Sequence, residues 1–138
     1  MGKKFNLEVV TPDRVFFADA TEMAIVRTTE GDFGILHDHE PLVAPLRVGS
    51  IRVKQENGAF RWAACTEGFV IVNDEKVTII TDSAEWSDEI DVDRAAKAKE
   101  RAEHRLHIHK VENKDVDVAR AKAALERAIN RMRLYENK

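Results

Sequence analysis

Hydrophobic and polar residues alternate with a period near two along the first part of the chain, as in Phe5, Leu7 and Val9 around Asn6 and Glu8. Similar short stretches, separated by turn residues, cover residues 15–17, 23–26, 33–36, 51–54, 60–63, 69–72 and 77–80. Asn57-Gly58 between two of them is typical of a hairpin turn, because both residues tolerate positive φ. Many short strands with frequent turns predict a β-sandwich or barrel.

The pattern changes to steps of three and four after Asp91, a good helix N-cap with Asp93 in the first turn. One apolar stripe follows it, at Val92, Ala95, Ala98 (or the stem of Lys99), Ala102 and Leu106. Residues 107–114 interrupt the pattern, and a cap at Asp115 or Asp117 restarts it. The second stripe consists of Val118, Ala121, Leu125, Ala128, Met132 and Tyr135. Two amphipathic helices joined by a short loop predict an antiparallel hairpin with an alanine-rich seam.

Composition divides the chain at the same place. All six glycines and all three prolines fall within the first 68 residues, where short elements are expected. Residues 1–87 carry 9 Lys/Arg and 14 Asp/Glu, and residues 88–138 carry 13 and 11, which together give the net charge of −3. We therefore expect an α+β, mainly β, protein with a β domain at 1–87 and a helical domain at 88–138.

Charge, cysteine content and hydropathy exclude several classes of function. A net charge of −3 argues against a nucleic-acid binder. The single cysteine, Cys65, cannot form an internal disulfide, which favours a reducing compartment. The longest apolar runs have about four residues, whereas a membrane-spanning helix needs roughly 20. We expect no direct insertion into a bilayer, so that any work at a membrane goes through a protein partner.

Catalytic arrangements are scarce. His37-Asp38-His39 could hold a metal ion, and so could His104 with His107, but turn and loop positions explain both sets as well. No glycine-rich phosphate loop or nucleophile elbow is present. Cys65, in an apolar run, is typical of a packed core thiol. The sequence therefore predicts no enzyme activity for the chain itself.

The helical part carries a set of arginines at helical spacing: Arg94, Arg101, Arg105, Arg127 and Arg131. Two interpretations stay open. The arginines could form a solvated face paired with Glu100, Glu103 and Glu126. Alternatively, their mutual repulsion could be relieved by a polyphosphate that accepts paired hydrogen bonds.

Four segments resemble a known family, the epsilon subunit of the bacterial F-type ATP synthase. They are Leu7–Asp13, Glu30–Leu36 followed by His39–Leu42, Ile90–Ala95, and Arg127–Arg131. Ile90-Asp91-Val92-Asp93-Arg94-Ala95 is similar to the family's nucleotide motif, Ile/Leu-Asp-x-x-Arg-Ala. His37-Asp38 departs from the usual Pro-Gly, and Glu67-Gly68 from the usual Gly-Gly.

The resemblance implies a ten-stranded β-sandwich followed by a two-helix hairpin, in a non-catalytic subunit of the central stalk. It implies contacts with the gamma subunit and the c-ring, with loops near Asp32 and His39 facing the ring, at the cytoplasmic face of the bacterial membrane. A mobile hairpin would inhibit ATP hydrolysis between the alpha and beta subunits and bind ATP when folded. The residues that match the ATP site are Glu85, Ile90, Asp91, Arg94, Ala95, Arg101, Arg127 and Arg131. Magnesium dependence stays open.

Two other functions remain as alternatives. A free-standing ATP-sensing module would share the hairpin but would not need gamma. A small metal-dependent hydrolase would use His37, Asp38 and His39.

Overall fold

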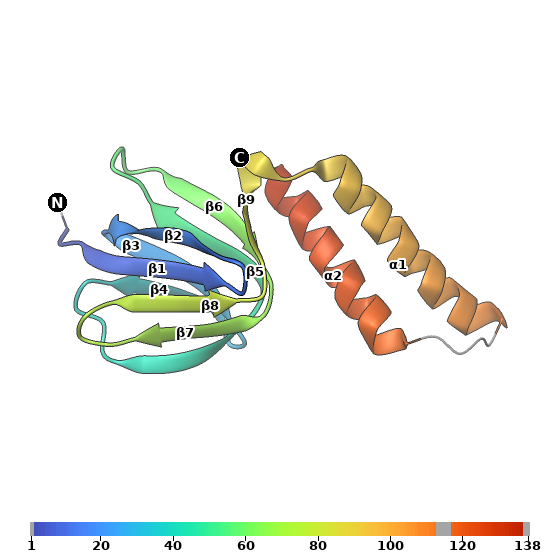
Figure 1. The fold of residues 1–138 in the computed structure, drawn as a ribbon, viewed down its shortest axis with the longest axis horizontal. Helices are drawn as coiled ribbons and strands as arrows, with labels where there is room; N and C mark the ends of the chain where they lie inside the picture. Colours follow the sequence, from blue (N-terminus) through green and yellow to red (C-terminus); the bar gives the residue numbers. More distant parts are fainter. Residues whose placement is uncertain (1, 113–116, 137–138) are drawn as a thin grey trace. The chain divides into compact units, whose positions relative to one another are not determined.

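The computed structural model describes residues 2–112 and 117–136 (Figure 1). Their contacts form two compact units, Met1–Trp86 and Ser87–Lys138. The described strands are β1 (Phe5–Thr11), β2 (Arg14–Thr21), β3 (Met23–Thr28), β4 (Gly31–Leu36), β5 (Leu42–Lys54), β6 (Phe60–Cys65), β7 (Gly68–Val72), β8 (Val77–Thr81) and β9 (Ala84–Trp86). A 3₁₀ turn, η1 (Ser87–Glu89), precedes two helices, α1 (Val92–Glu112) and α2 (Val118–Tyr135).

The first unit is a sandwich of two strand layers. One layer has the order β2-β1-β8-β7-β5, and the other consists of β4, β3, β5, β6 and β9. Strand β5 belongs to both, because Leu42–Leu46 pairs with β7 and Gly49–Lys54 pairs with β6. The described residues therefore form nine strands, and the implied count of ten is wrong: one continuous 13-residue strand serves two layers.

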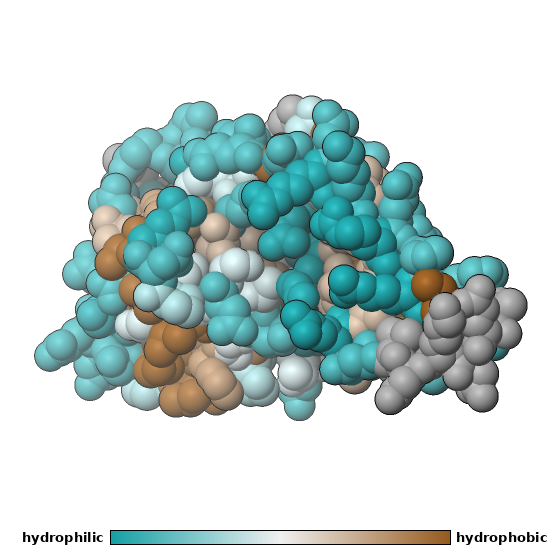
Figure 2. All heavy atoms as spheres, turned by 45° about the vertical axis from the view of Figure 1, so that its right-hand side comes forward, coloured by the Kyte–Doolittle hydropathy of each residue, from teal (hydrophilic) through white to brown (hydrophobic). Residues whose placement is uncertain are grey.

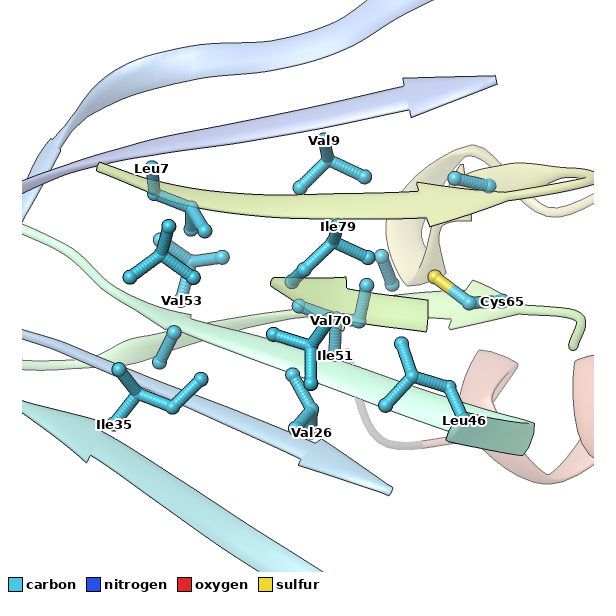
Figure 3. Packing of buried hydrophobic residues seen from close by; sticks show 14 of the residues in the cluster. Leu7, Val9, Val26, Ile35, Leu46, Ile51, Val53, Cys65, Val70 and Ile79 are labelled. Carbon is cyan, nitrogen blue, oxygen red and sulfur yellow. The ribbon is translucent and has the colours of Figure 1, made fainter. Parts of the chain in front are cut away.

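The core lies between the two layers. Figure 3 shows side chains from one layer, such as Leu7 and Ile79, pointing toward side chains from the other, such as Val26 and Ile51. These residues are at most 2% exposed. Alternation in β1 and β8 places every second residue in this core, as the period-two pattern predicted. The predicted class, a β-sandwich followed by helices, is confirmed.

Two glycines fit backbone positions that a side chain would disturb. Gly58 has φ +87° in the turn between β5 and β6, and Asn57 Oδ1 there accepts a hydrogen bond from the Ala59 N–H at 2.9 Å. This agrees with the predicted Asn-Gly turn. At Gly68 a Cβ atom would lie 1.8 Å from the Ile80 carbonyl oxygen. The close approach of β7 to β8 therefore requires glycine at this position.

Two strand segments were absent from the sequence prediction. The first half of β5 contains Pro45, which argues against a strand when only the sequence is available. Pro45 is exposed and opposite Phe69 of β7. The other segment is β9, which has only three residues and pairs with β6.

The second unit is an antiparallel hairpin of α1 and α2, as predicted (Figure 1). Its seam buries Ala95 and Ala102 of α1 and Ala121, Ala128 and Leu134 of α2. Asp117 caps α2 by accepting a hydrogen bond from the Arg120 N–H at 3.0 Å. The alternative cap, Asp115, lies outside the described residues. Figure 2 shows one face of the molecule, which is mostly hydrophilic, with a larger apolar area at the lower left and a smaller apolar spot at the right.

The predicted interruption of the first helix at residues 107–114 is wrong for its first part. Helix α1 continues through His107 and His109 to Glu112. No glycine or proline stands in this segment to end the helix. His104, His107 and His109 are therefore exposed helix residues rather than loop residues. No described helix combines the length and the apolar character needed to cross a membrane.

Candidate functional site

The Ile90–Ala95 motif forms the start of α1. Asp91 caps the helix: its Oδ1 accepts a hydrogen bond from the Arg94 N–H at 3.1 Å, and its carbonyl oxygen accepts one from the Ala95 N–H at 3.1 Å. Ile90 and Ala95 are buried, whereas Asp91 and Arg94 are exposed. The motif therefore combines a helix cap, two buried apolar residues and an exposed cation within six residues.

Within the described residues, four arginines of the hairpin lack the carboxylate partners expected for a solvated, salt-bridged face. In the part of the chain that the structure describes, the side chains of Arg94, Arg101, Arg105 and Arg127 have no hydrogen bond or ion pair to another residue. Arg131 does have a partner. The same holds for the predicted partners: Glu100, Glu103 and Glu126 form no ion pair within the described residues. Uncompensated guanidinium groups are able to receive an anion.

The hairpin brings most of the predicted ATP-site residues to corresponding levels of its two helices. Arg94 is in the first turn of α1, and Arg131 is near the end of α2, which contacts η1 beside that start. Arg101 and Arg127 each lie near the middle of their helix, and Arg127 and Arg131 are half-buried. Glu85 belongs to β9 in the other unit, opposite Ala64 of β6. The hairpin by itself therefore holds seven of the eight residues.

The histidine loop between β4 and β5 is built differently from a metal site. The His39 ring lies edge-on to Phe33, with 4.9 Å between ring centroids. Its Nδ1 lies 2.7 Å from the Glu40 carbonyl oxygen, which can only accept, so Nδ1 carries the proton. His37 and Asp38 are exposed. Over residues 2–112 and 117–136, no group of three or more His, Cys, Asp or Glu side chains is arranged to hold a metal ion.

The two positions implied as ring-facing lie in different surroundings. Asp32 is at the start of β4, and His39 follows the end of that strand. Asp32 accepts hydrogen bonds from Arg27 Nε at 2.6 Å and from Arg52 Nη2 at 3.0 Å. Arg52 in turn lies 4.2 Å over the Trp62 ring. The Asp32 carboxylate is thus occupied within its own layer.

An apolar row crosses the outer face of the β2-β1-β8-β7-β5 layer, and sequence reasoning missed it. Neighbouring strands pair Val15 with Val10, Val10 with Ile80, Ile80 with Phe69, and Phe69 with Pro45. Val15, Phe69 and Ile80 are 57%, 52% and 45% exposed. We call these five residues the apolar row. Each comes from a different strand, so only the register of the sheet reveals it.

Cys65 is a packed thiol. It is 4% exposed, and burial raises its pKa to about 12. A thiol that stays protonated at neutral pH is a poor nucleophile.

Comparison with known proteins agrees with this architecture over residues 4–136. The family profile described as the β-sandwich domain of the ATP synthase delta/epsilon chain matches residues 4–87. The profile described as the long α-helix domain of the same chain matches residues 88–136. The fold and its tandem profiles define a class, a β-sandwich with a C-terminal helical domain.

Relatives and solved structures give the same result. ATP synthase epsilon chains from Alkaliphilus oremlandii and Alkalihalophilus pseudofirmus are 58% and 49% identical, over 77% and 80% of this chain and 78% and 82% of theirs. A chain in the cryo-EM structure of the Euglena gracilis mitochondrial ATP synthase, OSCP/F1/c-ring, superposes with a TM-score of 0.74 at 29% identity. This superposition covers 89% of the present chain and 76% of that one. The chain belongs to the ATP synthase delta/epsilon chain family, and the predicted resemblance to the epsilon subunit is confirmed.

Proposed function

We propose that the chain is the non-catalytic epsilon subunit of the central stalk of a proton-translocating F-type ATP synthase. The observation that carries the proposal is the tandem match of both family profiles, which together span residues 4–136. The sandwich would join gamma to the c-ring, and the hairpin would reach the alpha and beta subunits. The chain would then be peripheral at the cytoplasmic face of the bacterial membrane, held there by its protein partners.

The apolar row is the surface that we assign to gamma. Exposed apolar side chains that are contiguous across five strands are costly in water and typical of a protein interface. Phe69→Asp should abolish co-purification with gamma while the unfolding midpoint of the sandwich stays within a few degrees. Leu36→Asp is the matched control, since Leu36 is also 52% exposed but lies on β4 in the other layer. Equal retention of gamma by both variants would contradict the assignment.

The hairpin is proposed to bind ATP when its helices are closed. The support is that, within the described residues, the guanidinium groups of Arg94, Arg101 and Arg127 have no carboxylate partner, because a triphosphate would supply the missing charge and accept paired hydrogen bonds. Arg94, Arg101, Arg127 and Arg131 would hold phosphates, and Ile90, Asp91 and Ala95 would contact adenine. Glu85 is proposed as a further residue of the site. ATP would act as a regulatory ligand, and it would not be hydrolysed.

ATP concentration could set the position of the hairpin. A ligand that binds only the closed form stabilises it by RT ln(1 + [L]/Kd), roughly 2.7 kcal/mol at a hundredfold excess over Kd. Because the seam is mostly alanine, the free-energy difference between the closed and extended hairpin would be small. A ligand contribution of about this size is able to reverse it. In the extended position, the hairpin would block ATP hydrolysis by the alpha and beta subunits.

Calorimetric titration of the isolated chain with ATP tests the site. Arg94→Ala and Arg127→Ala should each weaken binding about 10- to 100-fold, because each removes a charged hydrogen-bonding group. Arg105→Ala is the matched control, since it removes an exposed arginine of α1 outside the proposed site. Repeating the titration with EDTA determines whether magnesium takes part. Unchanged affinity in both site variants would reject the proposal.

The cap residue Asp91 needs a control of its own, because its loss also weakens α1. Asp117→Ala removes the equivalent cap from α2 without touching the proposed site. Asp91→Ala should weaken ATP binding more than Asp117→Ala does at an equal loss of helicity. Equal effects would show that Asp91 acts only as a cap.

The alternatives predict different results in two assays. A free-standing ATP-sensing module would bind ATP but would not co-purify with gamma, whereas the stalk subunit does both. A metal-dependent hydrolase would need His37, Asp38 and His39 to converge, and the described residues show no such group. A metal assay on purified protein would decide this last point.

A further inference from the structure

The last strand of the sandwich is short, although it is the strand from which the chain continues into the second unit. Strand β9 has three residues and, in the described sheet, pairs with β6 alone, through Ala84 with Cys65 and Trp86 with Ala63. It is also the final element of the first unit, because the second unit begins at Ser87. A three-residue edge strand offers few ladder hydrogen bonds and would fray unless something else held it.

Trp86 helps to hold β9 in place, because its side chain contacts strands of both layers. Its ring lies 4.6 Å from the Phe16 ring and 6.0 Å from the Phe17 ring, both on β2. The guanidinium of Arg61 on β6 lies over the Trp86 ring, 4.0 Å from its centroid. Arg14 lies over Phe16 and donates a hydrogen bond from Nη2 to the Ala84 carbonyl oxygen at 3.4 Å. We call Arg14, Phe16, Phe17, Arg61 and Trp86 the Trp86 cluster.

The turn before β9 is held as well. Thr66 Oγ1 accepts a hydrogen bond from the Ser83 N–H at 2.9 Å, and the Thr66 N–H donates to the Ser83 carbonyl oxygen at 3.2 Å. Thr81 Oγ1 donates to the Thr66 carbonyl oxygen at 3.0 Å, and both threonines are buried. These bonds tie the chain on the N-terminal side of β9 to the loop that follows β6.

We propose that the Trp86 cluster is the anchor of the helical hairpin: it holds Ala84–Trp86 in the sandwich, so that movement of the hairpin begins at Ser87. Both ends of β9 are then held by side chains of the sandwich, and Ser87 is the first residue of the second unit. Phe16, Phe17, Arg61 and Trp86 act as positioning residues in this device.

The anchor sets the length of the chain segment that connects the hairpin to the sandwich. Releasing β9 would add three residues to the connection between the two units, about 10 Å at roughly 3.3 Å per extended residue. A longer connection lowers the effective concentration of one unit near the other. The movement of the hairpin and its regulatory meaning rest on the proposed function, whereas the anchoring of β9 in the sandwich does not.

Hydrogen–deuterium exchange of the full chain tests the anchor. Trp86→Ala should raise the exchange rates of the amides of residues 84–86 at least tenfold. Trp62→Ala is the matched control, because Trp62 also carries an arginine over its ring, Arg52 at 4.2 Å, but lies beyond the segment of β6 that pairs with β9. It should leave residues 84–86 unchanged. Slow exchange of Val70 and Ile79 in every variant shows that the core is intact.

The outcomes separate clearly. Unchanged exchange of residues 84–86 in Trp86→Ala, with an intact core, would overturn the proposal. So would an equal rise in Trp62→Ala. Should Trp86→Ala unfold the sandwich, Arg61→Met replaces it, with Arg52→Met as its control and a several-fold rise at 84–86 as the expected result. An equal rate in both of these variants would likewise overturn the proposal.

A second measurement distinguishes the anchor from the proposed function. In a Glu85→Ala variant, which removes the proposed ATP contact from β9, saturating ATP should slow exchange in residues 87–91 as the hairpin closes and leave residues 84–86 as they were. Slowing of 84–86 together with 87–91 would show that β9 moves with the hairpin and would overturn the anchor. No response to ATP anywhere would count against the proposed ATP site, and the comparison of variants would still decide the anchor.

Discussion

The two units of the chain bury very different side chains. The sandwich encloses valine, isoleucine and leucine side chains from both layers, among them Leu7, Val26 and Ile79 at no more than 1% exposure. The hairpin buries four alanines and Leu134 in its seam. Full burial of a large aliphatic side chain contributes about 1.5–3 kcal/mol, whereas an alanine contributes only its single methyl group. We therefore expect burial to stabilise the sandwich strongly and the closed hairpin only marginally.

The difference also appears in the charges. In the sandwich, Asp32 bridges Arg27 and Arg52, and Glu22 pairs with Lys54 at 3.1 Å. In the described part of the hairpin, four arginines have no such partner. Within the described residues, ion pairs are therefore a feature of the sandwich, and these four guanidinium groups of the hairpin remain without one.

Removing a core side chain should give the largest effect. Ile79→Ala is expected to lower the free energy of unfolding of the sandwich by about 2–5 kcal/mol, because it leaves a cavity between the layers. Ile80→Ala, on the same strand but 45% exposed, should cost less than about 1 kcal/mol. Urea unfolding followed by tryptophan fluorescence measures both. Similar losses would mean that the core is not where the structure places it.

The Cys65 thiol should make the stability of the sandwich depend on alkaline pH. Burial raises its pKa from 9.0 to about 12, so the unfolded chain loses the proton first. Stability is then full below pH 9 and falls between pH 9 and 12, by up to about 1.4 kcal/mol per pH unit. Urea unfolding across that range should show a steeper decline for the wild type than for Cys65→Ala. Parallel curves would contradict the buried, neutral thiol.

Enlarging the seam should disturb only the hairpin. Ala128→Leu is expected to cost about 1–3 kcal/mol of helix pairing, because Ala128 is 1% exposed and a larger side chain would overpack the seam. Ala119→Leu, on the exposed side of α2, serves as the control and should change little. Thermal melting followed at 222 nm measures the helices. A more stable hairpin in Ala128→Leu would show that the seam is loose.

The smallest effect should come from a cap. Asp117→Ala removes the acceptor for the Arg120 N–H and is expected to cost about 1 kcal/mol. Exchange of the first amides of α2 should quicken, while the amides of β7 and β8 stay protected. Loss of protection in those strands as well would show that the two units unfold together.

Local patterns along the chain were enough to predict most elements. Alternation in β1 and β8, the Asn57-Gly58 turn and the caps at Asp91 and Asp117 all depend on neighbours within a few residues. Elements that depend on distant partners were missed. The first half of β5 contains a proline, and β9 is too short to show a period. Helix α1 passes through a segment whose pattern is broken but which contains no residue that ends a helix.

The candidate sites also include some features that the sequence predicts and others that only the structure shows. The positions of the arginines on the helices follow from spacing, so the sequence alone could group Arg94 with Arg101 and Arg127 with Arg131. The absence of carboxylate partners for Arg94, Arg101 and Arg127 within the described hairpin could not be read from the sequence, because glutamates stand at suitable spacings too. The apolar row and the Trp86 cluster each combine residues from several strands, and no periodicity connects them.

Strand β5 has a mechanical consequence. Because a single covalent backbone runs from one layer of the sandwich into the other, the layers cannot shear past each other without stretching that backbone or breaking its ladders to β7 and β6. Torque applied to one face would therefore reach the opposite face through peptide bonds as well as through packed side chains. In a subunit of the central stalk, a strand shared by both layers would make the sandwich stiffer.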